Sequence, residues 1–248
     1  MHMSKSVSGF LEKLGELSEN KIAIYVPSIK KAVDTSPLTL KQQKDLISSA
    51  LDGVKGAINF NKTLNEIIIK NTELKNLKIY DKLPFVISLR KESLGNKIKS
   101  DDEVVDLDEV VKNFKSVPFN LKEEKVVSLK TLKVHLRIPT LTEENVVLAK
   151  GEQDVVITDE STQKGVGTLY MLEIIKYIDK LTMGEDEVDM SQIKINDRIK
   201  LVEQLPLAMY NEIAKFIEAI NVYLRDVLTV GDTVVSIDAE FFDTSDVE

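Results

Sequence analysis

The spacing between apolar residues changes along the chain, and this change limits the folds that the chain can adopt. In the first and last parts of the sequence, apolar residues recur at three- and four-residue steps, which is the spacing of an amphipathic helix. Between Val126 and Ile138 the step shortens to two residues. Such alternation is typical of a half-buried antiparallel strand. The sequence therefore predicts an α+β fold, with a helical body and a small, mostly antiparallel sheet insert.

The same change in spacing divides the chain into three segments. Residues 1–95 are expected to form an N-terminal helical region with one short strand, and residues 96–165 a β-rich insert. Residues 166–248 are expected to form a C-terminal helical region that ends in a strand. The two helical regions could also make one compact domain. With 248 residues, the chain is long enough to bury a sizeable core without disulfides or metals.

The N-terminal segment begins with an amphipathic helix and a short strand. Phe10, Leu14 and their apolar neighbours follow helical spacing ahead of Lys21. Residues Lys21–Pro27 alternate between polar and apolar side chains, and Pro27 cannot donate to a ladder. A strand is therefore expected to end at this proline.

Three more helices are predicted before residue 96. Thr39 and Gln42 have the spacing of a capping box, so a helix should begin there. A second helix is expected to begin at a cap formed by Asn61, and a third to run from Lys82 to Leu94. The apolar residues expected to be buried by the first two are Leu46, Ile47, Ala50, Leu51, Leu64, Ile67 and Ile68.

The middle of the chain predicts irregular structure followed by strands. Residues 96–118 are polar and show no clear period, so loops are expected there. After the strand at Val126–Ile138, two more short strands are predicted at Asn145–Ala149 and Asp154–Thr158.

The last third predicts helices again. One should start near Thr168 and continue to Ile178, and a short strand-like stretch at Gln192–Ile195 precedes a helix capped by Asn196 and Asp197. Pro206 fits the first turn of a long helix with a wide apolar face, which Gly231 should end. A final strand is predicted from Val234 to Phe242.

The net negative charge is concentrated in the second half of the chain. Residues 1–124 hold 20 Lys and Arg against 18 Asp and Glu, whereas residues 125–248 hold 13 against 23, and the chain as a whole carries −8. This balance argues against a general affinity for nucleic acid or for an anionic membrane. No apolar run reaches the roughly 18–20 residues of a membrane span. We therefore expect neither nucleic acid nor membrane as a partner.

The sequence contains no recognisable catalytic or metal-binding arrangement. The absence of cysteine excludes thiol catalysis, disulfides and thiolate zinc sites. His135 has no serine at a spacing that would make it a catalytic partner, so a histidine on the surface of a strand is favoured. Gly184–Asp189 lacks the order of a calcium loop and is interpreted as a solvated linker. Gly165 and Gly167 lack the rest of a phosphate-binding loop and are interpreted as part of a flexible loop. No catalytic residue, cofactor or metal is expected.

The candidate functional residues are instead those that a partner protein could contact. Phe10 and Leu14 represent the first helix, which could dock elsewhere, and Lys133, His135 and Arg137 form a basic face of the predicted strand.

Phe241 and Phe242 are the remaining candidates. Successive residues of a strand point to opposite faces, so one of two adjacent phenylalanines must lie away from the first face. A sheet that is covered on both sides would explain this pair, and so would a partner surface. The sequence leaves both explanations open.

Several short stretches occur in an order that resembles a known family. They are Tyr25–Ser28, Lys30–Lys31, Pro37–Thr39, Lys41–Leu46, Asp81, Leu89–Arg90, Ser93–Gly95, Leu205–Pro206 and Ile237–Phe242. Their order and spacing resemble the baseplate hub subunit and hub assembly protein family of T-even-type, contractile-tailed bacteriophages. The resemblance is weakest between residues 96 and 165.

The resemblance implies a non-enzymatic structural or assembly role in the baseplate hub. The implied partners are other hub and tail proteins, with oligomerisation inside the hub as a further option. The implied location is the virion tail baseplate, with the host cytoplasm as the site of assembly.

Two alternatives remain open at the level of sequence. The chain could be a tail assembly chaperone that is absent from the mature virion. It could also be a cytosolic enzyme or ligand-binding protein whose site combines carboxylates with Arg90, Arg137 or His135. Convergence of these residues in a pocket would favour the second alternative.

Overall fold

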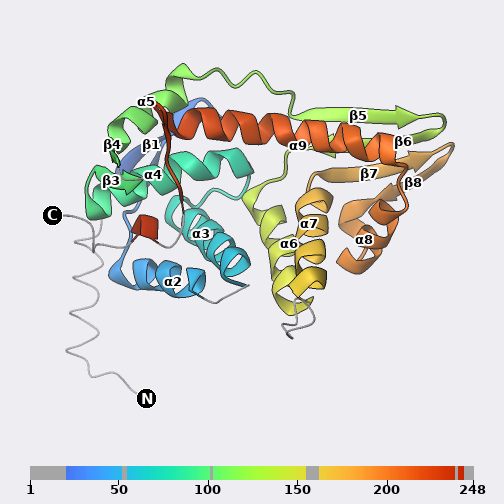
Figure 1. Ribbon diagram of the computed structural model, residues 1–248, viewed down its shortest axis with the longest axis horizontal. Coiled ribbons are helices and arrows are strands. Elements are labelled where there is room, and N and C mark those ends of the chain that lie inside the picture. Colours follow the sequence, from blue (N-terminus) through green and yellow to red (C-terminus); the bar gives the residue numbers. More distant parts are fainter. Residues whose placement is uncertain (1–20, 52–54, 101–102, 155–161, 238–239, 243–248) are drawn as a thin grey trace, which may run out of the picture.

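The computed structural model describes residues 21–51, 55–100, 103–154, 162–237 and 240–242. Helices and small antiparallel sheets make up this part of the chain, which confirms the α+β prediction. Figure 1 shows two groups of elements side by side, with one long helix running along both. The predicted first helix, with Phe10 and Leu14, lies outside the described residues, as does most of the strand predicted at Asp154–Thr158.

The first group begins with a hairpin and two helices. Strands β1 (Ile22–Val26) and β2 (Lys31–Thr35) pair antiparallel, and α2 (Leu40–Ala50) and α3 (Gly56–Thr72) follow. The strand ending at Pro27 and the capping box are both confirmed, since Thr39 Oγ1 accepts from the N–H of Gln42 and the Gln42 side chain accepts from the N–H of Thr39.

Two details of these helices were predicted wrongly. α3 begins at Gly56 and not at Asn61, whose side chain donates to the carbonyl of Ala57 one turn earlier. The apolar face predicted for α3 is correct. Leu51 is 72% exposed, because it lies just beyond the last residue of α2 and points away from the core.

The chain continues through the short helix η2 (Ile79–Asp81) into α4 (Lys82–Leu94). Gly95 ends α4 with φ of 94°, so the predicted bounds are confirmed. Asp81 does not cap α4 through its side chain. Its buried carboxylate accepts from the N–H groups of Ser28 and Lys78 and so ties the β1–β2 turn to the start of α4.

The stretch predicted as irregular is ordered. Strands β3 (Lys97–Ser100) and β4 (Glu103–Asp106) form a hairpin, and α5 (Leu107–Ser116) follows. The Asp106 side chain caps α5 by accepting from the N–H of Asp108. The helix buries Leu107, Val110 and Phe114, which follow helical spacing. This spacing is hard to recognise in a segment that is short and charged.

The second group is built on a four-stranded antiparallel sheet. Its strands lie in the order β5 (Glu124–Leu129), β6 (Leu132–Arg137), β7 (Ile178–Met183) and β8 (Asp186–Asp189). The single strand predicted at Val126–Ile138 is therefore a hairpin, which turns at Lys130 with φ of 55°. The predicted linker at Gly184–Asp189 is the β7–β8 turn plus strand β8, because Gly184 supplies the positive φ of 65° that this turn needs.

Helices α6 (Leu141–Asp154) and α7 (Thr162–Ile175) connect the two hairpins of the sheet. They replace the strand predicted at Asn145–Ala149 and the loop predicted around Gly165 and Gly167. α7 ends at Ile175, so Ile178 belongs to β7 and not to the helix as predicted. Short runs rich in valine, leucine and alanine can form either a strand or a helix, and here packing against other helices favours the helix.

The last described elements are two α-helices, a small hairpin and two short helical turns. These are η3 (Met190–Gln192), α8 (Ile195–Glu203), α9 (Leu207–Leu228), β9 (Thr229–Val230), β10 (Thr233–Val234) and η4 (Glu240–Phe242). The long helix after Pro206 is confirmed. The predicted strand at Gln192–Ile195 is wrong, since α8 starts at Ile195. Of the described residues in the strand predicted from Val234 to Phe242, only Val234 lies in a strand, β10, and Glu240–Phe242 form η4.

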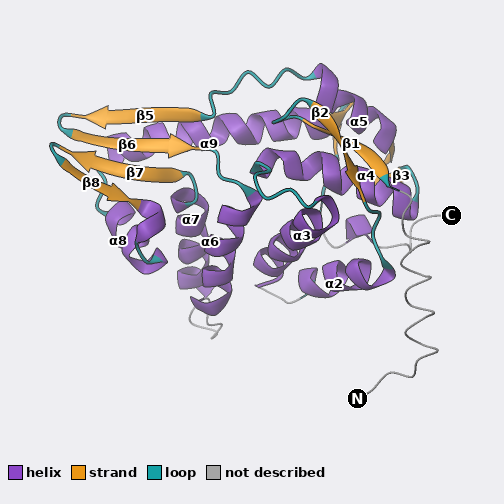
Figure 2. Ribbon diagram, turned by 180° about the vertical axis from the view of Figure 1, so that it is seen from behind, coloured by secondary structure: helices purple, strands orange, loops and turns teal. Residues whose placement is uncertain are grey.

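The sheet is covered on one face only. Figure 2 shows strands β5 to β8 in front of α9, with the face turned toward the viewer not covered by any described helix. Val127, Val134, Leu136 and Leu181 point inward and belong to one cluster of buried side chains that extends into the first group of elements. None of the helices in the described residues has the length and apolarity needed to cross a membrane.

Candidate functional site

The open face of the sheet carries the residues that the sequence predicted as a basic surface. Lys133, His135 and Arg137 alternate along β6 and are partly or fully exposed. In register, the side chains beside them come from Glu124, Val126 and Ser128 of β5 and from Lys180 and Thr182 of β7.

Arg137 is held by two carboxylates rather than presented to a partner. Its guanidinium donates to both oxygens of Glu143, at 2.8 and 2.6 Å, and to Asp179. Burial opposes ionisation of Glu143, but the hydrogen bonds from Arg137 and from Thr140 outweigh it and lower the pKa of Glu143 to about 2. These contacts raise the pKa of Arg137 further. Arg137 therefore joins β6, β7 and the start of α6.

The rest of this face is of mixed charge. Lys180 pairs with Glu187 at 2.9 Å, and Glu187 and Asp189 of β8 lie beside Thr182 and Lys180 on this face. Lys133 is exposed and makes no ion pair with a described residue. The basic residues of β6 therefore lie beside acids of neighbouring strands, which the sequence of β6 does not reveal. Their role in an interface stays a prediction.

A buried charged cluster lies where the two groups of elements meet. Glu144 of α6 accepts from Lys82 of α4 at 2.6 Å, from Asn65 of α3 at 2.8 Å and from Lys176 at 3.0 Å. The side chains of Lys82, Glu144 and Lys176 are only 11%, 6% and 10% exposed. Burial opposes ionisation of Glu144, but the two ammonium groups outweigh it, so the pKa of Glu144 is lowered and the carboxylate is charged.

This cluster fixes the packing of helices rather than forming an open site. Lys176 also pairs with Glu173 at 2.7 Å, so each buried charge has a partner of opposite sign. Glu144, Glu173 and Lys176 of the cluster also line a cavity of about 190 Å³, whose other walls are Asn61 and apolar side chains such as those of Ile58 and Leu172. The contacts of Glu144 thus join α6 to α3, to α4 and to Lys176 just after α7.

A third polar centre holds the C-terminal residues against the first group. The guanidinium of buried Arg90 donates to three backbone carbonyls, those of Phe241 at 2.7 Å, Gly95 at 2.9 Å and Lys97 at 3.4 Å. Gln43 of α2 donates to the carbonyl of Phe242 at 3.0 Å.

Phe241 and Phe242 consequently lie in the core. They are 1% and 0% exposed, and the ring of Phe242 lies 6.2 Å from that of Phe60. Both explanations left open by the sequence, a sheet covered on both sides and a partner surface, assumed a strand with rings on opposite faces, and the described fold has neither arrangement. The pair is not in a strand, and the turn of η4 lets both rings enter the core.

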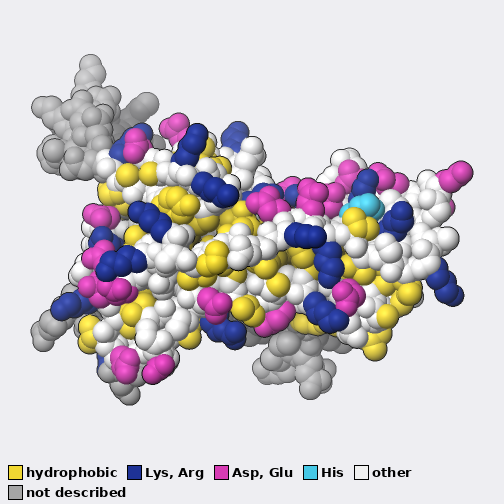
Figure 3. All heavy atoms as spheres, turned by 90° about the horizontal axis from the view of Figure 1, so that it is seen from above, with side chains coloured by type: hydrophobic (Ala, Val, Ile, Leu, Met, Phe, Trp, Pro, Cys, Tyr) yellow, Lys and Arg dark blue, Asp and Glu magenta, His cyan; other side chains and the backbone are white. Residues whose placement is uncertain are grey.

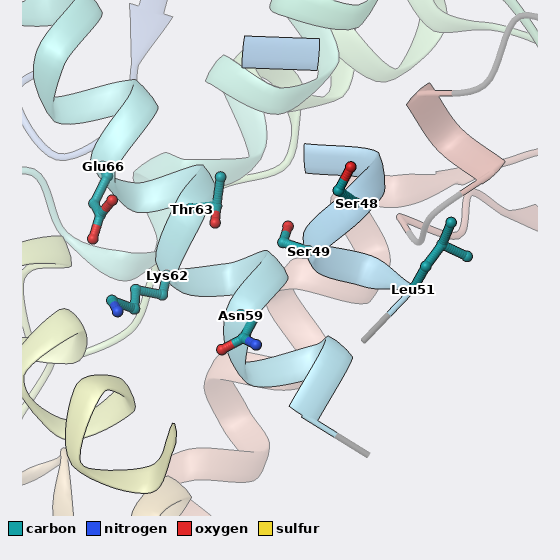
Figure 4. Close-up of a pocket in the computed structure, with 7 residues that line it drawn as sticks. All are labelled: Ser48, Ser49, Leu51, Asn59, Lys62, Thr63 and Glu66. Atoms are coloured by element: carbon teal, nitrogen blue, oxygen red, sulfur yellow. The ribbon is translucent and has the colours of Figure 1, made fainter. Parts of the chain in front are cut away.

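Two concave surfaces of the first group lie along α2 and α3. Figure 4 shows one of about 480 Å³, lined by Ser48, Ser49, Leu51, Asn59, Lys62, Thr63 and Glu66. A second, of about 290 Å³, shares Thr63 and Glu66 and extends toward Lys41 and Asn71. Both are shallow and lined by polar groups of both signs, and neither gathers the convergent residues of a catalytic site.

The residues proposed for an enzyme or ligand site do not converge. Arg90 is buried at the C-terminal end of α4, whereas His135 and Arg137 lie on the open face of the sheet. Within the described ranges, no group of three or more histidine, aspartate or glutamate side chains is placed to hold a metal ion. The charged residues of the described chain instead form ion pairs within the fold or lie on its surface.

Comparison with known families decides the identity of this fold. A family model described as T4 bacteriophage base plate protein matches residues 19–228. The chain belongs to the T4 bacteriophage base plate protein family. Comparisons of this baseplate protein with curated proteins and with solved structures give no match. The match begins just before β1 and ends with α9, so it includes both groups of elements and the buried cluster between them.

Sequence reasoning missed the buried cluster of this baseplate protein. One signal was present, since Glu144 lies three residues after Leu141 and three before Val147, on the apolar stripe of α6. A carboxylate on such a stripe indicates a buried partner. The identity of that partner could not be read from sequence, because Lys82 lies 62 residues away.

Proposed function

We propose that this baseplate protein is a structural or assembly component of the hub of a contractile phage tail and acts through protein–protein interfaces. The family match over residues 19–228 carries the proposal. The internal use of the charged groups supports it. Arg90, Arg137 and the Lys82–Glu144–Lys176 cluster hold elements of the fold together, as a rigid building block requires.

Two parts of the chain are proposed to meet neighbours: the open face of the sheet and the helix that the sequence predicts around Phe10 and Leu14, which lies outside the described residues. Lys133 and His135 lie on the open face and make no ion pair with a described residue. Phe10 and Leu14 belong to the N-terminal segment and contribute an apolar stripe by their sequence spacing. Interfaces of this kind combine an apolar core with a polar rim.

Co-expression with neighbouring tail genes tests the role. We expect the protein to co-purify in a stoichiometric complex, and the double variant Lys133→Glu, His135→Glu to reduce the yield of that complex. Lys44→Glu is the matched control, because Lys44 is equally exposed on α2, far from the sheet. A protein that stays solitary under these conditions would contradict the proposal.

Mass spectrometry of purified virions separates a resident subunit from an assembly chaperone. A hub subunit should be present in mature tails at a fixed ratio to other hub proteins. A chaperone should be present in infected cells and absent from the particles.

A further inference from the structure

The four-stranded sheet has two edges, and they differ in chemistry. At one edge, β8 is four residues long and exposes Asp186, Glu187 and Asp189. Carboxylates on a short edge strand discourage pairing with another strand, since a second copy would bring like charges together. At the other edge, β5 has six residues, no proline and no bulge in its pairing with β6. The charges of β5 are confined to its first two residues, Glu124 and Lys125, and Lys125 pairs with Glu212 of α9. The rest of the β5 edge lacks the usual protection by charge.

The backbone of β5 leaves three residues free to pair outward. The N–H of Ile138 donates to the carbonyl of Glu123, which identifies that pair as hydrogen-bonded. Because bonded and non-bonded pairs alternate in an antiparallel ladder, Lys125, Val127 and Leu129 also bond to β6. The N–H and C=O groups of Glu124, Val126 and Ser128 therefore point away from the sheet. No hydrogen bond joins them to another described residue.

This edge is open in space. Figure 2 shows β5 as the outermost strand, with α9 behind the sheet and no described element beyond the edge. Figure 3 looks down on the edge and shows hydrophobic side chains beside charged side chains of both signs. Val126 lies at the middle of the edge and is 52% exposed.

We propose that two copies of the chain associate through their β5 edges, antiparallel and centred on Val126, to form one continuous sheet. Twofold pairing about this residue places each Val126 opposite the partner's Val126 and each Glu124 opposite the partner's Ser128. Three residues on each side then satisfy their free backbone groups. The inference concerns the isolated protein and does not depend on the role in the hub.

Charge complementarity selects a second copy as the occupant. In the paired sheet, one row of side chains on the open face runs Arg137, Glu124, then the partner's Ser128 and the partner's Lys133. The carboxylate of Glu124 thus lies between two cations across the junction. Lys133, which makes no ion pair with a described residue, then lies two strands, roughly 10 Å, from the partner's Glu124 in the same row. The central row brings together two valines, and such apolar cross-strand pairs stabilise a sheet.

The size of the edge predicts a weak, reversible dimer. A junction of one strand from each copy buries less than the roughly 1,200–2,000 Å² of a stable interface. Sedimentation velocity on purified full-length protein should therefore show a weight-average mass that rises with concentration. Val126→Pro should remain monomeric, because it removes only an outward N–H, a position where edge strands tolerate proline.

The absence of cysteine permits a sharper test by disulfide trapping. Directly opposite hydrogen-bonded residues have Cα atoms about 5.5 Å apart, within the range that a disulfide spans. Val126→Cys should therefore form a covalent dimer on mild oxidation. Val146→Cys is the matched control, because Val146 is 55% exposed on α6 and lies away from the edge. Ser128→Cys tests the register, since each such thiol would lie roughly 13 Å from its symmetry mate at about 3.3 Å per residue.

We expect Val126→Cys to cross-link at least about tenfold faster than either other variant, because pairing raises the effective concentration of the second thiol. Circular dichroism on each variant before oxidation confirms that the thiol is presented by folded protein. Equal rates for Val126→Cys and Val146→Cys would overturn the proposal. Ser128→Cys reacting as fast as Val126→Cys would overturn the register centred on Val126. A mass that stays at the monomer value at all concentrations would also refute the dimer.

Discussion

The Nε–H of Arg90 donates to the backbone carbonyl of Phe241, 151 positions later in the chain, at 2.7 Å. The other two acceptors of this guanidinium are also backbone carbonyls, at the end of α4 and in β3. One buried side chain thus joins the C-terminal turn η4 to two earlier elements. The closing residues of the described chain are part of the folded body for this reason.

Replacing Arg90 with lysine should destabilise the protein by about 2 kcal/mol or more, because one ammonium group cannot reach carbonyls that a planar guanidinium spans. Urea denaturation followed by circular dichroism measures the effect. Arg225→Lys is the control, since Arg225 is exposed on α9 and should change stability by no more than about 0.5 kcal/mol. Equal losses from both variants would show that the three carbonyl contacts contribute little.

Truncating Phe242 to alanine should cost about 3–5 kcal/mol, the usual range for a fully buried phenylalanine. The ring packs against Phe60 and Phe241, and its removal leaves a cavity between α2, α4 and η4. Leu40→Ala, at a residue that is 74% exposed, provides the comparison and should be nearly neutral. A Phe242→Ala protein of normal stability that failed to join its tail partners would instead indicate an interface role.

Replacing Glu144 with glutamine should destabilise the protein by about 3–5 kcal/mol, since it leaves the buried ammonium group of Lys82 without a carboxylate partner. Thermal unfolding of the variant gives the measurement. Glu173→Gln is a matched control within the same cluster. Its carboxylate also pairs with Lys176, but it is 49% exposed, so a loss below about 1 kcal/mol is expected. Comparable losses from the two variants would mean that burial of the Glu144 contacts is unimportant.

Local signals predicted those elements whose stability comes from nearby residues. The structure confirms the capping box of Thr39 and Gln42 and the end of α4 at Gly95. Each of these signals depends on residues only a few positions apart. The α+β class and the long helix α9 also follow from the period of apolar residues.

Long-range packing decides the elements that the sequence left unresolved. Asn145–Ala149 is short and rich in valine, and it forms a helix because α6 packs against α3 and α7. The candidate site follows the same rule. From the sequence, Arg137 was expected to be a free cation on the surface. In the fold it donates to Asp179, which is 42 residues away in the sequence. A pairing of that kind has no signature in either local sequence.

The contacts of Glu143 predict how stability depends on pH. Because its pKa falls from an ordinary value of 4.5 to about 2 in the folded protein, its contribution to stability is fully present above about pH 4.5. The contribution is lost as the pH falls from 4.5 toward 2, since the unfolded chain binds the proton first. Replacing Glu143 with glutamine should therefore lower the urea midpoint at pH 7.

The difference between wild type and Glu143→Gln should shrink steadily as the pH is lowered through that window. Urea titrations at several pH values between 7 and 2.5 measure it. Glu218→Gln is the control, because Glu218 is exposed on α9 and accepts no hydrogen bond from a described residue, so its midpoint should follow that of wild type throughout. A difference for Glu143→Gln that persists unchanged to pH 2.5 would show that the variant acts through lost packing and not through the charge that Arg137 and Thr140 stabilise.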